Sequence, residues 1–249
     1  MISEYHRPKT TDEALSLLAR ENIVTVPLAG GSAINRPSTE QVAVVDLQAL
    51  GLDWFDRRGN TLMLGAMLTL QNLSGIEGLP VALLQAVRHE ASYNTRQVAT
   101  VAGTLVAADG RSPFVTAMLA LDVDLTLLPG NELIRLGNLL PVRSERLDGR
   151  LITQITLPVN VRLAYEYVAR TPADLPIVCI AVARWSSGRT RVTLGGYGQA
   201  PMLALDGPEP SGAVEAAKNA YLLAADQWAS ASYRSDVVGV LVQRCLDGL

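Results

Sequence analysis

Residue types that build metal centres and covalent cross-links are scarce in this sequence. It contains two cysteines, Cys179 and Cys245, both in apolar surroundings, and two histidines, His6 and His89. Two cysteines are too few for an iron–sulfur cluster or a disulfide framework, which favours a cytoplasmic location. Two histidines cannot assemble a zinc site or a histidine-based triad. The sequence therefore predicts neither a metal site nor a catalytic residue of its own.

Basic runs and long apolar runs are also missing. The net charge at pH 7 is −3, and the isoelectric point is about 5.5. Without a cluster of lysine and arginine there is no electrostatic footprint for nucleic acid. The longest strongly apolar run, Ile177–Ala183, is too short to span a membrane, and the first residues lack the layout of a signal peptide.

Apolar residues are abundant although charged ones are few. Hydrophobic residues make up 49% of the chain and charged residues 18%, and the mean hydropathy is +0.21. This balance is typical of a compact core rich in alanine, valine and leucine, and it also suits a surface that a partner covers. Composition alone does not locate such an interface.

The first 46 residues predict a small parallel α/β unit. Thr10-Thr11-Asp12-Glu13 has the pattern of a capping box, which starts a helix that Asn22 closes. Ile23–Val26 and Val42–Val45 are rich in β-branched residues and predict strands, the second one ending in Asp46. Between them lies Pro27–Ser32, a turn of small residues.

The following hundred or so residues alternate between strand and helix patterns. Thr69 can cap a short helix, and Pro80 occupies a favoured position at a helix start. The expected elements are strands at Thr61–Ala66, Val123–Leu128 and Leu151–Leu157, helices at Pro80–Glu90 and Pro113–Leu121, and turns at Thr100–Thr104 and Pro129–Asn131.

The composition changes after Pro158, and we place a domain boundary at Pro158–Val161. The C-terminal part predicts three strands followed by helices, which indicates a separate α+β domain. The strands are Arg162–Ala169, Ile177–Trp185 and Arg191–Gly195, with a hairpin turn at Ser186–Gly188, a link at Asp206–Gly212, and helices at Ala213–Ala225 and Ser235–Leu246. The predicted domains are residues 1–158, divided into subdomains at about 1–49 and 50–158, and residues 161–249.

Two glycine-containing turns, one around Gly30 and one around Gly103, carry the clearest chemical signal. Glycine lets backbone amides approach a phosphate closely, because no Cβ intervenes. Neither turn has the three spaced glycines of a dinucleotide fingerprint or the Lys-Ser/Thr of a phosphate loop. We expect the two turns, although distant in sequence, to converge on one diphosphate through main-chain donors.

The order of short motifs along the whole chain resembles the flavin-binding middle subunits of molybdenum hydroxylases, the xanthine dehydrogenase and aerobic CO dehydrogenase flavoprotein family. The matching segments are Tyr5-His6-Arg7-Pro8, Leu28-Ala29-Gly30-Gly31-Ser32, Gly65-Ala66 with Thr69, Arg96–Thr104, Ala108-Asp109, Leu119–Asp122, Tyr165-Glu166 with Arg170, Asp174-Leu175-Pro176, Leu194-Gly195-Gly196 and Ala231-Ser232-Tyr233-Arg234.

The resemblance implies an α+β fold in which a two-subdomain, PCMH-type FAD-binding domain precedes a small C-terminal domain with a three-stranded antiparallel sheet and helices. It implies FAD as the cofactor. Electrons would pass from a large molybdopterin-binding subunit to the 2Fe–2S clusters of a small partner subunit, then to the FAD of this chain, and finally to NAD⁺, oxygen or a quinone. The FAD-contacting residues it implies are Leu28, Ala29, Gly30, Gly31, Ser32, Ala33, Ile34, Asn35, Ala99, Thr100, Ala102, Gly103, Thr104, Val106, Asp109, Ser112, Leu151 and Ile152.

The sequence departs from the family pattern at several of these positions. Ala33 and Thr104 replace polar side chains, Pro113 replaces an aspartate, Tyr167 replaces a lysine, and Ala102 adds a methyl group where glycine is usual. Each lost side-chain hydrogen bond costs about 0.5–1.5 kcal/mol, and backbone contacts are unaffected. We therefore expect FAD binding to be weakened but retained.

Two alternatives stay open at this point. One is a degenerate subunit of the same complex that keeps the fold as a scaffold between its partners and holds no FAD. The other is a free-standing flavin oxidase or reductase, for which the sequence offers no acid–base pair.

Overall fold

The chain forms two compact units from interleaved stretches of sequence. The computed structural model describes residues 2–34 and 41–249. Unit 1 contains Met1–Gly75, Tyr93–Ala107 and Asp124–Thr156, and unit 2 contains Ile76–Ser92, Ala108–Val123 and Leu157–Leu249. The boundary expected at Pro158–Val161 lies close to Thr156, where the last stretch of unit 1 ends. The division into two consecutive domains stays a prediction.

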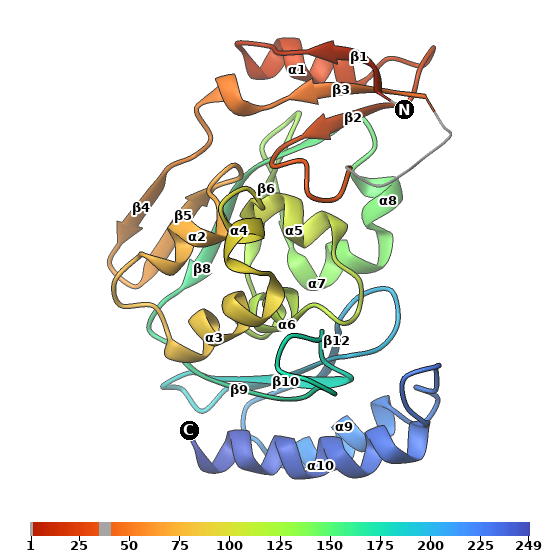
Figure 1. Ribbon diagram of the computed structural model, residues 1–249. Helices are drawn as coiled ribbons and strands as arrows, with labels where there is room; N and C mark the ends of the chain where they lie inside the picture. Colours follow the sequence, from red (N-terminus) through yellow and green to blue (C-terminus); the bar gives the residue numbers. More distant parts are fainter. Residues whose placement is uncertain (1, 35–40) are drawn as a thin grey trace. The chain divides into compact units, whose positions relative to one another are not determined.

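A parallel sheet opens unit 1, as the sequence predicts, but it has three strands where two were predicted. Its strands β1 (Ile2–His6), β2 (Thr25–Leu28) and β3 (Val42–Asp46) lie in the order β1-β3-β2. Helix α1 (Thr11–Leu18) packs against β2 and β3 (Figure 1). Strand β1 was not predicted.

The expected capping box begins α1. The amide of Glu13 donates to the hydroxyl of Thr10 at 3.2 Å, and the carboxylate of Glu13 accepts from the amide of Lys9 at 3.0 Å. The prediction that Asn22 closes this helix is wrong, because α1 ends at Leu18. Leu18 is the last residue of the helix that packs into the core, and no apolar side chain after it extends the buried face.

A five-stranded sheet, in the order β4-β5-β8-β6-β7, forms the second layer of unit 1. The strands are β4 (Phe55–Arg58), β5 (Thr61–Gly65), β6 (Asp124–Leu128), β7 (Glu132–Arg135) and β8 (Leu151–Pro158). Short helices connect them: η1 (Gln48–Leu50), α2 (Leu70–Ser74), α4 (Tyr93–Arg96), α5 (Val101–Ala107), α7 (Leu136–Leu139), η2 (Leu140–Val142) and α8 (Arg143–Arg146). The predicted cap at Thr69 is confirmed, since its hydroxyl accepts from the amide of Asn72 at 3.1 Å.

The second small-residue turn, predicted at Thr100–Thr104, is instead the start of helix α5. The hydroxyl of Thr100 accepts from the amide of Gly103 at 3.1 Å, and its carbonyl accepts from the amide of Thr104 at 2.9 Å. Val101, Ala102 and Leu105 are buried, which is the spacing of one helical face. A capping threonine followed by small residues suits a turn and a first helical turn equally well, so the local pattern was misread.

Unit 2 contains a four-stranded antiparallel sheet in the order β12-β11-β10-β9. Its strands are β9 (Arg162–Val168), β10 (Val178–Arg184), β11 (Thr190–Gly195) and β12 (Met202–Gly207). The prediction of three strands is therefore wrong. Val192 pairs with Leu205 and Thr193 with Leu203, so Ala204 is an extra residue that breaks the alternation expected of a strand. The predicted link at Asp206–Gly212 overlaps β12, because Asp206 and Gly207 are the last two residues of that strand.

Helices cover both faces of this sheet. α9 (Ala213–Ala220) and α10 (Ala231–Asp247) lie along one face, as Figure 1 shows, and α3 (Val81–Glu90) and α6 (Pro113–Ala120) pack on the other. Every residue of α6 is buried, as is nearly all of β10. Within the described residues no helix has both the length and the apolar character needed to cross a membrane.

A buried arginine fixes the loop between α9 and α10. Arg234 is fully enclosed, with 0% of its surface exposed. Its guanidinium donates hydrogen bonds to the carbonyl oxygens of Ile177, Gly196, Ala224 and Ala229 and to the carboxylate of Asp226. One side chain therefore joins the loop to the ends of two strands of the sheet.

Candidate functional site

The parallel strands of unit 1 all end at one edge of their sheet. β2 ends at Leu28 and leads into the turn of residues 29–34, and β3 ends at Asp46 and leads into η1. Ligands of open parallel sheets bind beyond the carboxyl ends of the strands. This edge is therefore where a ligand site is expected in unit 1.

Gly30 brings the turn after β2 against the segment that precedes α5. A Cβ on Gly30 would lie 1.7 Å from the carbonyl oxygen of Val98, so only glycine allows the two backbones to come this close. Farther along, a Cβ on Gly103 would lie 3.8 Å from the Cβ of Ala29. The predicted convergence of the two segments is confirmed, and their convergence on a diphosphate stays a prediction.

The two segments differ in the hydrogen-bond donors that they can offer. The amide of Ala102 donates to the carbonyl of Ala66 at 3.3 Å, and those of Gly103 and Thr104 donate to Thr100. Among the described residues, by contrast, no atom accepts from the four successive amides of residues 30–33. The main-chain donors that can still bind a ligand therefore belong to the turn after β2.

A cavity of about 330 Å³ opens beside this turn. Its walls come from the turn, from η1 and the residues after it, from the end of β5, from α2, and from the segment before α5. The lining residues are Ala29, Gly30, Gln48, Leu52, Asp53, Met67, Thr69, Asn72, Gln97, Val98 and Thr100. Three of the predicted FAD-contacting residues, Ala29, Gly30 and Thr100, meet here.

The remaining predicted residues lie around the cavity or away from it. Leu28, Gly31, Ser32, Ala33 and Ile34 belong to the turn or its approach, and Asn35 lies outside the described residues. Ala99 is buried, and Val106 is on the exposed side of α5. Asp109 and Ser112 belong to unit 2. The cofactor contacts of all these residues stay predictions.

Leu151 and Ile152 were expected to wall the flavin ring or the adenine. Both are buried in β8, with 3% and 5% of their surfaces exposed. Leu151 packs in the core with Leu18 and Met67, and Ile152 pairs with Leu127 of β6. In unit 1 they support the sheet from within, and neither lines the cavity.

Ala102 carries the methyl group that departs most visibly from the family pattern. It is buried, with 8% of its surface exposed, and is not part of the cavity wall. Within unit 1, therefore, the extra methyl group packs into the protein and does not narrow the cavity.

The hydroxyl of Ser112 makes its hydrogen bonds inside unit 2. Its hydroxyl donates to the carboxylate of Glu90 at 2.6 Å and accepts from the amide of Val115 at 3.1 Å, which caps α6. Glu90 also accepts from the amide of Phe114 at 3.0 Å. Burial raises the pKa of Glu90 above its ordinary value, although these two hydrogen bonds oppose the shift.

Replacing Glu90 with glutamine is expected to make the protein more stable at neutral and mildly alkaline pH and to leave its stability in acid nearly unchanged. The pKa of Glu90 is higher in the folded than in the unfolded state, so the folded state binds more protons. The contribution of Glu90 to stability therefore falls as the pH rises from the ordinary pKa of glutamate to the raised pKa of the folded state. Glutamine stays neutral and can still accept from Ser112 and Phe114. Urea denaturation across this pH range measures the effect.

The exposed Glu209 of unit 2 provides the matched control, because its change to glutamine removes a carboxylate that has no buried environment. If Glu90→Gln and the wild type show the same pH dependence, the carboxyl of Glu90 is not held in its protonated form by the fold.

Tyr167, which stands where the family usually has a lysine, is part of an aromatic cluster in unit 2. Its ring centroid lies 4.2 Å from that of His89 and 5.8 Å from that of Tyr165, with which it is stacked. The substitution thus replaces a charge with packing between β9 and the end of α3.

Sequence reasoning missed most of the cavity wall. Gln48, Leu52 and Asp53 follow β3 in a connection that has no motif, and Met67 and Asn72 flank the cap at Thr69. Gln97 and Val98 fall inside a recognised motif but were not assigned contacts. The only signal that could have pointed to Gln48 and Asp53 is their place just beyond the carboxyl end of a parallel strand.

Comparisons with known proteins agree over nearly the whole chain. Residues 1–160 match the family described as the FAD binding domain in molybdopterin dehydrogenase. The protein named "Uncharacterized protein YgfM" of Escherichia coli K12 is 30% identical, covering 97% of this chain and 94% of its own. The carbon monoxide dehydrogenase medium chain of Afipia carboxidovorans is 27% identical, covering 98% and 95%.

The fold has a counterpart of known structure. The crystal structure of the cyanide-inactivated form of Cu,Mo-CO dehydrogenase matches with a TM-score of 0.81 at 24% identity, covering 99% of this chain and 97% of that chain. The resemblance seen in the sequence, the α+β fold class, FAD as the cofactor and the assignment to the oxidoreductases are confirmed. The chain belongs to the family of FAD-binding domains of molybdopterin dehydrogenases.

Proposed function

We propose that the chain is the FAD-binding electron-transfer subunit of a heteromeric molybdenum hydroxylase. A small 2Fe–2S subunit would deliver electrons to it, a large molybdopterin subunit would hold the substrate, and NAD⁺, oxygen or a quinone would receive the electrons. Membership of the FAD-binding family supports the cofactor. The likeness to a protein named as the medium chain of an enzyme supports a place among other subunits.

The turn after β2 is the observation that carries the proposal. Four successive amides, at residues 30–33, have no acceptor among the described residues, and the first of these residues, Gly30, lines a cavity. Successive amides at a tight turn form a concave site for anions such as the diphosphate of a dinucleotide. A hydrogen bond to a charged group is worth about 1.5–3 kcal/mol, so this turn alone can supply much of the binding.

The residues of unit 1 fit FAD despite the departures from the family pattern. The loss of a polar side chain at Ala33 leaves its amide in place, and the methyl group of Ala102 is packed away from the cavity. The amides of α5 are engaged within the protein, so residues 30–33 hold the diphosphate without them. When bound, the flavin supplies the redox chemistry, and the protein binds and orients it.

Addition of FAD to the purified chain tests the function. We expect bound flavin after gel filtration, with the visible absorption of an oxidised flavoprotein, and quenching of flavin fluorescence on titration. Bleaching of that absorption by dithionite and its return in air would show that the bound flavin is redox-active.

A protein that stays colourless after incubation with excess FAD would contradict the proposal. That outcome would favour the FAD-free scaffold, in which the same fold serves only to join partner subunits.

A further inference from the structure

One side of helix α10 is exposed and carries a row of three residues whose charges are opposite at its two ends. Asp236, Val240 and Arg244 are spaced four residues apart, which places them one above the other on the same side of a helix. All three are exposed, and Val240 leaves 53% of its surface accessible. The opposite side of α10 packs into the core of unit 2. The fold of unit 2 therefore does not need the exposed row.

The two charged residues of the row have no partner in the monomer. Asp236 and Arg244 are eight residues apart in sequence, or about 12 Å along the helix axis, which is too far for a direct contact. Within residues 2–34 and 41–249, neither side chain forms an ion pair or a hydrogen bond. An unpaired carboxylate and an unpaired guanidinium therefore flank an exposed valine.

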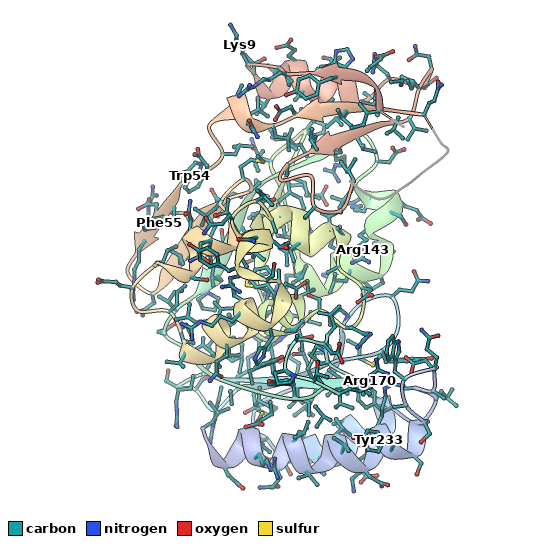
Figure 2. All side chains as sticks on the ribbon, viewed as in Figure 1. Lys9, Trp54, Phe55, Arg143, Arg170 and Tyr233 are labelled. Carbon is teal, nitrogen blue, oxygen red and sulfur yellow. The ribbon has the colours of Figure 1, made fainter. Side chains whose placement is uncertain are left out.

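A groove runs beside this row, between α9 and α10. Its volume is about 430 Å³, and it is lined by Val214, Lys218, Asp236, Gly239, Val240, Gln243 and Arg244. Gly239 lets α9 lie close to α10, because a Cβ there would lie 2.6 Å from the Cε of Lys218. Both helices lie along one face of the four-stranded sheet (Figure 1), and Tyr233, labelled in Figure 2, lies near the start of α10. A ridge of side chains on another helix fits into a groove of this kind.

The row is complementary to a copy of itself that runs in the opposite direction. Turning α10 end for end about Val240 exchanges the positions of Asp236 and Arg244. A second α10 laid antiparallel, with valine against valine, thus brings each aspartate opposite the arginine of the other copy. Such a contact uses the same patch on both subunits, which is the requirement for closed two-fold symmetry. Antiparallel helices also place opposite ends of their dipoles side by side.

From these features we propose that the chain forms a symmetric homodimer through the exposed side of α10. The Val240 side chains meet at the two-fold axis, and two equivalent ion pairs between Asp236 and Arg244 flank them. The contact is one helix wide and buries less than about 1,200 Å², as weak and reversible complexes do. The inference does not rest on the proposed function, because none of these residues is assigned to FAD.

Charge reversal tests the dimer, with sedimentation velocity over a range of protein concentrations as the measurement. Wild type should show a monomer–dimer equilibrium with a dissociation constant in the micromolar range. Asp236→Arg or Arg244→Asp alone places like charges opposite each other at both ends of the contact. Each should raise the dissociation constant by about tenfold to a hundredfold. Combining the two reversals restores opposite charges and should restore dimerisation.

Glu209→Arg is the matched control for Asp236→Arg. It makes the same change in net charge at an exposed residue of unit 2 that does not line the groove, so it should dimerise like wild type. Circular dichroism verifies that the variants fold. The proposal would be overturned by a wild type that is monomeric at every concentration or by single reversals that dimerise like wild type. A double reversal that stays as dissociated as the single ones would overturn it too.

Discussion

Replacing Arg234 with methionine is expected to lower the free energy of unfolding by about 3–5 kcal/mol, the range measured when one partner is removed from a buried charged network. Arg234 is completely enclosed, and its guanidinium satisfies four carbonyl oxygens and the carboxylate of Asp226. Methionine fills much of the same space but cannot donate, so the carbonyl oxygens of Ile177, Gly196 and Ala224 would lose the hydrogen bonds that Arg234 gives them. Urea denaturation followed by circular dichroism measures the loss.

Arg244 provides the control on the same helix. It lies on the exposed side of α10, so Arg244→Met should change the free energy of unfolding by less than about 0.5 kcal/mol. Equal stabilities for the two variants would show that the contacts of Arg234 contribute little to the fold.

Replacing Gly30 with alanine is expected to weaken FAD binding by about tenfold to a hundredfold. A Cβ at this position would lie 1.7 Å from the carbonyl oxygen of Val98, and a backbone atom cannot move aside as a flexible side chain can. Overpacking of this kind costs about 1–3 kcal/mol, which is relieved only if the turn moves away from the segment before α5. That movement would separate the free amides from the cavity.

Gly75→Ala is the control for this variant. Gly75 belongs to the same unit, and a Cβ there would lie 3.4 Å from the nearest atom, the carbonyl oxygen of Asn72. FAD titrations of both variants, with thermal melting to verify folding, separate a local effect on the site from a general loss of structure. Tight FAD binding by a folded Gly30→Ala protein would mean that the contact with Val98 is not needed for the site.

Local signals in the sequence predicted local structure well. Thr10 and Thr69 cap helices as expected, because a cap depends on residues within one turn of the chain. The same logic misled at Thr100, whose hydroxyl also caps a helix, since small residues after it suggested an open turn. Strand β12 was missed because Ala204 interrupts the alternation of buried and exposed residues.

The candidate site was predictable only in part, because its wall is assembled from segments that carry no common motif. Gly30 was identified, since a glycine after a strand has a recognisable purpose. Gln48 and Asp53 were not, because their proximity to the turn depends on how strands β2 and β3 align in the sheet. Both turns were expected to offer main-chain donors, and it could not be foreseen that the amides of Ala102, Gly103 and Thr104 already donate within the protein.

The interleaving of the two units has a consequence for how the protein is made on the ribosome. Helix α6, whose eight residues are all buried, is synthesised well before strands β10 and β11, against which it packs. During that interval α6 can pack against α3, which is already synthesised, but its side chains that face the sheet stay exposed, and exposed apolar surface favours aggregation. In a protein built from two consecutive domains that interval would be shorter, because one domain would be complete before the next is synthesised.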